Sequence, residues 1–316
     1  MASQRFTLVT DDSLDLHVHS WLPAASPRAV VLLAHGMADH AGRYAALGAA
    51  LTAAGYALYA HDQRGHGQTG AAGVPGLFAA CDGWRRVVAD LSLLRAEIAR
   101  RLPGTPVVLL GHSMGSYIAQ AWLIENASQV AGAVFSGSNY QPASLYHNAR
   151  HIARFERWRQ GPLGRSALIE WLTFGSFNKA FRPNRSGYDW LSRDTEAVDR
   201  YIADPLCGFR CTNQLWFDLL GGLAHISTEA NLARTRPGLK LLIIGGECDP
   251  VSAGKRLTDL GNAWRLSARA QVRTIIYPQA RHEVFNELNR AQVVGDLIAW
   301  LDTLGATAPT DEPINP

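Results

Sequence analysis

The sequence predicts an α/β protein with a mostly parallel central sheet, helices on both faces and a helical cap insertion. Three observations support this fold class. Continuous apolar runs bounded by turn residues, typical of strands covered on both faces, alternate with Ala- and Leu-rich helical segments. This alternation stops near residue 139 and resumes near residue 239. The composition, 47% hydrophobic and 18% charged over 316 residues, is that of a globular protein with a sizeable core.

The elements follow in a regular order. Residues 14–22 alternate apolar and polar side chains, which predicts a half-buried strand in an antiparallel start to the sheet. The expected strands and helices then run 29–36, 44–54 (helix), 56–62, 84–101 (helix, with Asp82 as N-cap), 106–113, 114–125 (helix) and 130–138. After the insertion come a strand at 239–249, a helix at 255–266, a strand from 272 and a closing helix at 291–304. We therefore divide the chain into a core at 1–139 and 223–305, a cap at 140–222 and a Pro-rich flexible tail at 306–316.

Charge, termini and cysteines restrict the class of protein. A net charge of +3 is too small to imply a nucleic-acid partner. The N-terminus has no basic segment followed by an apolar one, and no apolar run reaches the roughly 18–20 residues of a membrane span. No His or Cys pair with zinc-ligand spacing accompanies Cys207 and Cys211. We expect a cytoplasmic protein with reduced, mostly packed thiols and no metal site.

Gly111-His112-Ser113-Met114-Gly115 lies where an apolar strand ends and an Ala-rich helix begins. A G-x-S-x-G pattern in that context predicts a nucleophile elbow, with Ser113 in a strained backbone conformation. Side chains at positions 111 and 115 would collide with the neighbouring strand and helix, so glycine is the residue that fits. Taken alone, the same five residues are also compatible with an ordinary glycine-flanked turn.

A nucleophilic serine needs a base that a carboxylate orients, and two later strand ends supply candidates. Asp249 follows the run LLIIGGEC, and His282 follows TIIYPQAR. Because the carboxyl ends of parallel strands meet at one edge of a sheet, we predict that Ser113, Asp249 and His282 form a catalytic triad. Two alternatives stay open: Asp249 is only a turn former, with Glu247 as the acid, or His282 is a surface loop residue. Glu283 is expected to be solvated.

The oxyanion of the tetrahedral intermediate needs two N–H donors. We predict the backbone N–H groups of Met114, directly after the nucleophile, and Met37, in the loop after the 29–36 strand. Gly36 in that loop permits close approach, so Gly36 and His112 are expected to contact substrate together with unidentified cap residues. His35 either contributes to the site or only braces the loop.

Five stretches in this order resemble the monoacylglycerol lipase and lysophospholipase group of α/β-hydrolases, the serine-aminopeptidase-like branch. They are HGMADHAGRY (35–44), HDQRGHGQTG (61–70), GHSMGS (111–116), GECDPVS (246–252) and ARHEVFNE (280–287). The resemblance implies an α/β-hydrolase fold, a Ser–Asp–His esterase with a cap over an acyl pocket, and no metal or organic cofactor. It assigns the same roles to Ser113, Asp249, His282, Met37 and Met114. One departure is position 116, a serine where the family usually has a second small glycine.

Asp62, Arg64 and His66 in the HDQRGHG stretch admit a phosphate-loop or metal-site interpretation. No GK[ST] follows, so we favour a structural loop in which Asp62 and Arg64 pair.

The insertion is rich in basic and aromatic residues. Between 145 and 185 it carries seven arginines and one lysine but only two acids, with Trp and Phe interleaved. This pattern fits an exposed face over a small apolar core, or a lid that contacts anionic lipid surfaces or phosphate-bearing substrates. Nucleic acid is not expected, because no binding motif accompanies the charge.

We therefore expect a serine hydrolase that cleaves carboxylic esters through an acyl-enzyme, acting on monoacylglycerols or lysophospholipids. The alternative is the same scaffold with another scissile bond, as in an aminopeptidase or amidase, a thioesterase or a haloperoxidase. A non-catalytic binder is disfavoured, because all three triad residues are present.

Overall fold

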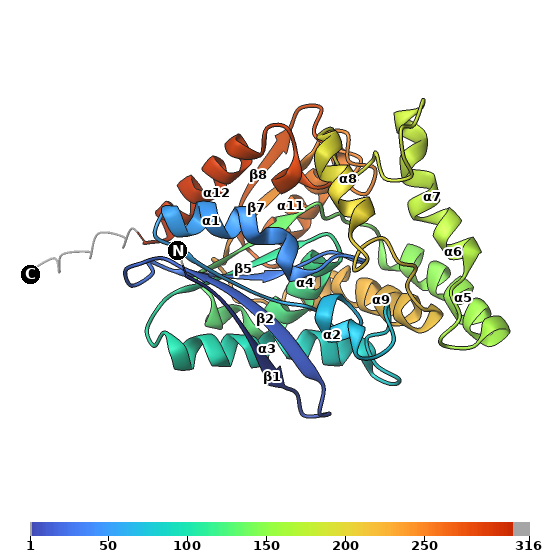
Figure 1. The fold of residues 1–316 in the computed structure, drawn as a ribbon, viewed down its shortest axis with the longest axis horizontal. Helices are drawn as coiled ribbons and strands as arrows, with labels where there is room; N and C mark the ends of the chain where they lie inside the picture. The colour runs from blue at the N-terminus through green and yellow to red at the C-terminus, as the bar shows by residue number, and fades with distance from the viewer. Residues whose placement is uncertain (1, 306–316) are drawn as a thin grey trace, which may run out of the picture.

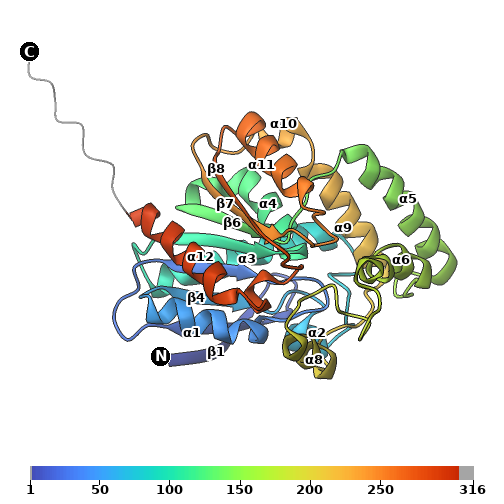
Figure 2. The same ribbon diagram turned by 90° about the horizontal axis from the view of Figure 1, so that it is seen from above.

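The structure, a computed structural model, describes residues 2–305, so the expected flexible tail at 306–316 lies outside the described residues. Its centre is a sheet with the strand order β1-β2-β4-β3-β5-β6-β7-β8 (Figures 1 and 2). The strands are β1 (Ala2–Val9), β2 (Asp15–Leu22), β3 (Val30–Ala34), β4 (Ala57–His61), β5 (Val107–His112), β6 (Gly132–Ser136), β7 (Lys240–Gly246) and β8 (Gln271–Tyr277). β2 pairs antiparallel with β1 and β4, and the remaining pairs are parallel. The predicted α/β fold is confirmed.

Helices cover both faces of the sheet. Along β3, Val31 and Leu33 pack with residues of α1 (Ala45–Ala53) and α12 (Arg290–Gly305). Val30 and Leu32 point to the other face. There they join residues of α3 (Gly83–Arg101), α4 (Met114–Asn126) and α11 (Lys255–Ser267). Burial on both faces explains why these strands are continuous apolar runs in the sequence.

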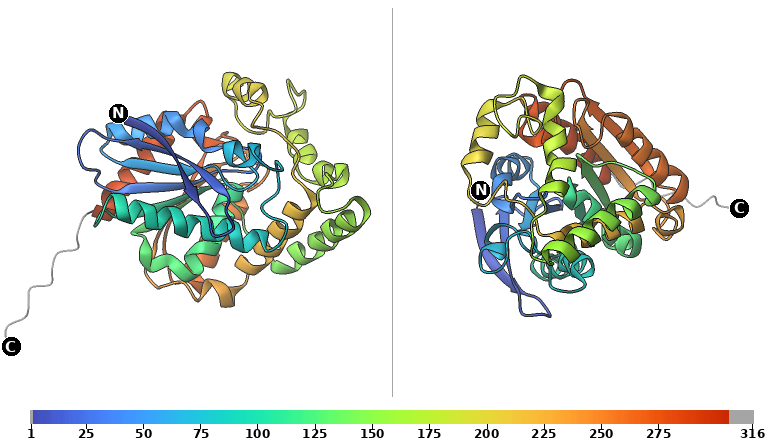
Figure 3. Two further views of the ribbon diagram at one scale, coloured as in Figure 1. Left: turned by 60° about the horizontal axis from the view of Figure 1, so that its bottom comes forward. Right: turned by 90° about the vertical axis from the view of Figure 1, so that its right-hand side faces the viewer.

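The insertion is helical and lies at one end of the molecule (Figures 1 and 3). Its helices are α5 (Ala143–Gln160), α6 (Ala167–Leu172), α7 (Phe174–Phe177), α8 (Thr195–Ala203) and α9 (Asn213–Ile226). α9 packs on α5 and also on α3 and α4, so it joins the insertion to the core. Because α9 is continuous through residue 222, the predicted boundary at that residue falls inside a helix. We keep the name cap for residues 140–222. Within residues 2–305, no helix is both long and apolar enough to cross a bilayer.

Two sequence-based interpretations are wrong in detail. Asp82 precedes α3 in a left-handed conformation (φ 53°) and makes no side-chain capping bond, so it is not the predicted N-cap.

Arg64 does not pair with Asp62, which instead accepts hydrogen bonds from backbone N–H groups. The Arg64 guanidinium donates hydrogen bonds to Asp90 (2.7 Å) and Asp12 (2.8 Å). Each of these partners lies more than twenty residues from Arg64 in the sequence.

Arg64 therefore stabilises the core, and its removal can be tested. Its side chain is only 2% exposed, and burial raises the pKa of Asp90 to about 6 even with the guanidinium beside it. Arg64→Ala should lower the free energy of unfolding by about 3–5 kcal/mol, because it leaves a buried carboxylate without a partner. Arg100→Ala, which removes an exposed ion pair with Glu97, is the control and should leave the denaturation midpoint nearly unchanged. Equal midpoints for the two variants in urea unfolding would contradict this assignment.

Candidate active site

Ser113 connects β5 to α4 in a strained conformation, with φ 51° and ψ −121°. A Cβ added to Gly111 would lie 2.5 Å from the Gly115 carbonyl oxygen and the Ser116 Cα. One added to Gly115 would lie 2.1 Å from the Ala34 carbonyl oxygen, at the end of β3. These approaches confirm the steric reason for both glycines, and they place the serine hydroxyl above the sheet edge at the N-terminus of α4.

Hydrogen bonds hold this turn in place. The Ser113 N–H donates to the Ser136 carbonyl at the end of β6 (2.8 Å). The Ser116 N–H (2.8 Å) and hydroxyl (2.6 Å) both donate to the Ser113 carbonyl. Ser116, the departure from the family pattern, thus supplies an additional bond to the elbow.

Asp249 and His282 meet at the same sheet edge. They follow β7 and β8, both side chains are buried, and the distance from His282 Nδ1 to Asp249 Oδ1 is 3.0 Å. Because a carboxylate only accepts, this bond puts the proton on Nδ1 and leaves Nε2 free to act as a base. Glu247, the rival acid, is exposed and accepts a bond from the Gln279 N–H instead.

His282 and Ser113 line one cavity. The ring of His112, next to the serine, lies 4.9 Å from the His282 ring, and a Cβ on Gly137 would lie 3.0 Å from His282 Cε1. Among the described residues no hydrogen bond joins the serine hydroxyl to the imidazole. In unliganded sites such bonds are often long and tighten with substrate. The fold therefore brings together the three residues predicted for the triad. Asp249 and His282 are hydrogen-bonded, whereas within residues 2–305 the Ser113 hydroxyl and His282 are not.

Burial and charge act oppositely on the imidazoles. Burial alone would lower the pKa of His282, but the Asp249 carboxylate beside it raises that pKa above its ordinary value of 6.5. Burial lowers the pKa of His112 to about 4, with the nearby His282 adding to the shift. His112 is thus neutral at physiological pH and bonds Ser136 Oγ at 3.2 Å.

The two predicted N–H donors also reach this cavity. Met37 and Met114 both line it, and in residues 2–305 neither N–H donates to a loop or side-chain acceptor. Gly36 lies against Ser113, since a Cβ there would be 3.4 Å from Ser113 Cβ. His35 braces the loop: its Nδ1 donates to the Gly36 carbonyl (2.8 Å) and its Nε2 accepts from a backbone N–H (2.9 Å).

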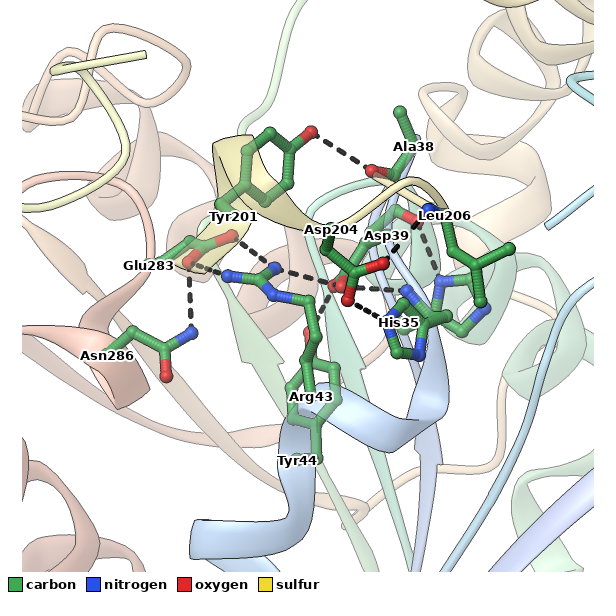
Figure 4. Close-up of polar contacts among 12 residues, drawn as sticks. His35, Ala38, Asp39, Arg43, Tyr44, Tyr201, Asp204, Leu206, Glu283 and Asn286 are labelled. Carbon is green, nitrogen blue, oxygen red and sulfur yellow. Dashed lines mark hydrogen bonds and ion pairs between the residues drawn. The ribbon is translucent and has the colours of Figure 1, made fainter. Parts of the chain in front are cut away.

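A buried ion-pair network beside the site was not predicted from the sequence (Figure 4). Arg43 donates two hydrogen bonds to Glu283 (2.8 and 2.7 Å) and one to Asp39 (2.9 Å). Glu283 is thus buried, and our expectation that it is solvated is wrong. Burial alone would raise the pKa of both carboxyls, but Arg43 holds both below their ordinary values. Asp39 follows the predicted oxyanion loop and Glu283 follows His282, so Arg43 joins the two loops.

The cap holds the same two loops. The Tyr201 hydroxyl (3.0 Å) and the Gly208 N–H (3.1 Å) both donate to the Ala38 carbonyl, and the Tyr201 ring covers the Arg43 guanidinium at 4.8 Å (Figure 4). On the base loop, the Glu283 N–H donates to the Leu191 carbonyl at 2.8 Å. The cap is therefore fastened to both sides of the site.

The cavity has a volume of about 220 Å³. Aromatic side chains dominate its cap side, which identifies cap residues that the sequence left unknown: Tyr146, Phe174, Phe177, Tyr188, Trp190 and Trp216. Its charged lining is acidic: Asp39, Glu283 and, from α6, Glu170, whose pKa burial raises. Among the described residues no Lys or Arg lines the cavity.

Comparisons with known proteins agree with this arrangement. The chain is 31% identical over 286 residues to a monoacylglycerol lipase of Mycolicibacterium smegmatis, covering 89% of this chain and 90% of that protein. It is 28% identical to the human monoglyceride lipase, covering 97% and 93% of the two chains.

Solved structures share the fold. A thermostable carboxyl esterase from Bacillus coagulans in complex with glycerol superposes with a TM-score of 0.88 at 21% identity, covering 97% of this chain and all of the other. A soluble variant of monoglyceride lipase from Saccharomyces cerevisiae gives 0.77 at 19% identity, covering 98% and 97%. The family described as serine aminopeptidase, S33, matches residues 25–289, and the chain belongs to this family of α/β-hydrolases.

Proposed function

We propose that this protein hydrolyses carboxylic esters of neutral lipids, monoacylglycerols foremost, through an acyl-enzyme on Ser113. The observation that carries the proposal is the meeting of Ser113 with the bonded pair of Asp249 and His282 at one cavity. The resemblance to named monoacylglycerol lipases over nearly the whole chain supports the substrate class.

In the proposed reaction, His282 Nε2 removes the hydroxyl proton as Ser113 Oγ attacks the acyl carbonyl. The N–H groups of Met37 and Met114 stabilise the oxyanion, and Asp249 stabilises the imidazolium. His282 then gives its proton to the leaving alcohol, and water repeats the cycle on the acyl-enzyme.

The charge of the cavity favours a neutral head group over a phosphate. A lysophospholipid places a phosphate near the scissile ester, where it would face carboxylates and no cation of the lining. A glycerol hydroxyl, in contrast, can donate to Glu170, which has no side-chain hydrogen-bond partner within the described residues. The aromatic cap lining suits an acyl chain.

Amide hydrolysis is the second candidate. The family carries the description of a serine aminopeptidase, and the free carboxylate of Glu170 can pair with a substrate ammonium as well as with a hydroxyl. The aromatic lining favours a lipid chain over a peptide, so esters stand first.

We further propose that the cap meets lipid surfaces. Its exposed apolar side chains include Phe155, Trp158, Leu168 and Trp171. Arginines share this segment, although several are engaged locally, such as Arg159 with Glu156. Exposed apolar side chains on a segment with an excess of basic residues fit an anionic membrane interface.

Ser113→Ala should reduce turnover of short p-nitrophenyl esters about 10⁴- to 10⁶-fold, because the nucleophile is lost while the fold is kept. Ser128→Ala, at an exposed position just after α4, is the matched control and should retain full activity. A fluorophosphonate probe should label the parent and the control but not Ser113→Ala. Labelling of all three proteins would overturn the assignment.

A substrate panel separates the candidates. We expect monoacylglycerol to be cleaved at least about tenfold faster, by kcat/KM, than lysophosphatidylcholine or an aminoacyl anilide of similar size, because a like-charge or unpaired contact costs roughly 1.4 kcal/mol or more. Preference for the anilide would favour the aminopeptidase alternative, and preference for the phospholipid would contradict the argument from cavity charge.

The pH profile follows from His282. His282 must be neutral to act as the base, so kcat/KM should rise as the pH increases through the pKa of His282. Because that pKa is raised above 6.5, the midpoint of the rise should lie above pH 6.5. Asp249→Asn removes the carboxylate that raises the pKa and leaves burial, which lowers it. Its residual activity should fall about 10⁴-fold, with the midpoint shifted to lower pH. Glu247→Gln should leave the midpoint in place; a shift in that variant instead would make Glu247 the acid.

Vesicle binding tests the cap surface. Trp158, 79% exposed on α5, should contribute apolar contact with lipid. Trp158→Ala should weaken co-sedimentation with phosphatidylglycerol vesicles about fivefold to tenfold, equivalent to roughly 1 kcal/mol. Leu266→Ala is the control, since Leu266 is 80% exposed on α11, outside the cap. Equal losses in both variants would show that the contact is not specific to the cap.

A further inference from the structure

Three potential metal ligands converge where the cap meets the core. His40, Asp204 and Cys207 each offer one ligand atom, a ring nitrogen, a carboxylate oxygen and Sγ, and these atoms all lie within 4.8 Å of one another. His40 belongs to the core, three residues after Met37, whereas Asp204 and Cys207 lie between α8 and α9. This cluster has no role in the proposed reaction.

The donor set favours a transition metal. One imidazole nitrogen, one carboxylate oxygen and one thiolate sulfur are the ligand types that zinc prefers, usually in tetrahedral geometry. The His40 and Asp204 side chains are 13% and 29% exposed, so an ion can enter from solvent and keep a water in the fourth position. Calcium and magnesium are disfavoured, because they require mostly oxygen ligands.

The ligands are held by further contacts. Asp204 Oδ1 accepts from the Leu206 N–H (2.9 Å), which orients the carboxylate and leaves Oδ2 toward His40. The Cys207 N–H donates to the Asp204 carbonyl (3.0 Å), which fixes the short segment that carries both groups. Such outer contacts are typical of metal sites, where they orient the ligands.

The local charge also favours a dication. Asp39 and Glu283 pair with the guanidinium of Arg43, and Asp204 bonds His40 nearby (Figure 4). The three carboxylates and the one guanidinium carry a net charge of −2. A divalent cation beside Asp204 would balance this excess.

We propose that His40, Asp204 and Cys207 bind one divalent transition-metal ion, Zn²⁺ being the best match, which ties the cap to the loop that carries Met37. On binding, the Cys207 thiol loses its proton to solvent and its sulfur bonds the metal. The hydrogen bond from His40 Nε2–H to Asp204 breaks, the Nε2 proton leaves to solvent while Nδ1 takes one up, and the neutral imidazole binds the metal through Nε2. No electron transfer is involved. Without the metal, His40 Nε2 bonds Asp204 Oδ2 at 2.9 Å and Cys207 packs with Trp190 and Tyr201.

Cobalt substitution gives a direct test that needs no activity. The full chain, freed of metal with a chelator, is titrated with Co²⁺ and followed by the thiolate-to-cobalt charge-transfer absorption in the near ultraviolet and by the visible bands of tetrahedral cobalt. Thermal unfolding is measured in parallel with and without Zn²⁺. The variants are Cys207→Ser and His40→Ala, with Cys211→Ser as matched control, because Cys211 is buried four residues further on but outside the cluster.

We expect one cobalt ion per chain, a charge-transfer band in the parent and in Cys211→Ser, and a higher Tm with Zn²⁺ in both. Cys207→Ser should lose the band, and both ligand variants should bind at least about tenfold more weakly. Unfolding without metal shows whether each variant is folded. Absence of the band from the folded parent, its persistence in Cys207→Ser, or its loss only in Cys211→Ser would overturn the proposal. Activity on esters is scored separately, so failure here leaves the proposed reaction untouched.

Discussion

The bidentate contact of Arg43 with Glu283, together with its bond to Asp39, is the interaction on which the geometry of the site depends. Ser113 is held by steric constraints at the end of β5, but the loops that carry Met37 and His282 are connections at other strand ends. Arg43 joins them directly, and Tyr201 covers it from the cap. The relative position of the oxyanion donor and the base is therefore set by side chains rather than by the sheet alone.

Local signals predicted the sheet, the strained turn at Ser113 and the meeting of Asp249 with His282. Ser113, Asp249 and His282 follow β5, β7 and β8 in turn, and topology brings the ends of parallel strands to one edge. The same local reasoning failed for Glu283 and Arg64. Their partners, Arg43 and Asp90, are remote in sequence, and a charged residue in a loop carries no local sign of being buried.

The cap shows a further limit of sequence analysis. Composition predicted helices but not which of their side chains reach the cavity, because that depends on how α6 and α7 lie over the core. Spacing along the chain also disfavoured a metal site at Cys207 and Cys211. The cluster that the fold assembles uses His40, more than 160 residues away from Asp204. Spacing rules detect metal sites whose ligands lie close together in the sequence. They miss clusters whose ligands come from the cap and from the core.

The charges around Arg43, between the two loops, also explain why this residue is an arginine. Besides Asp249, both Asp39 and Glu283 raise the pKa of His282. Arg43 pairs with both carboxylates, and its planar guanidinium bonds them at once, whereas a lysine would offer a point charge without that fixed geometry. The same residue thus joins the two loops and balances part of the negative charge beside His282.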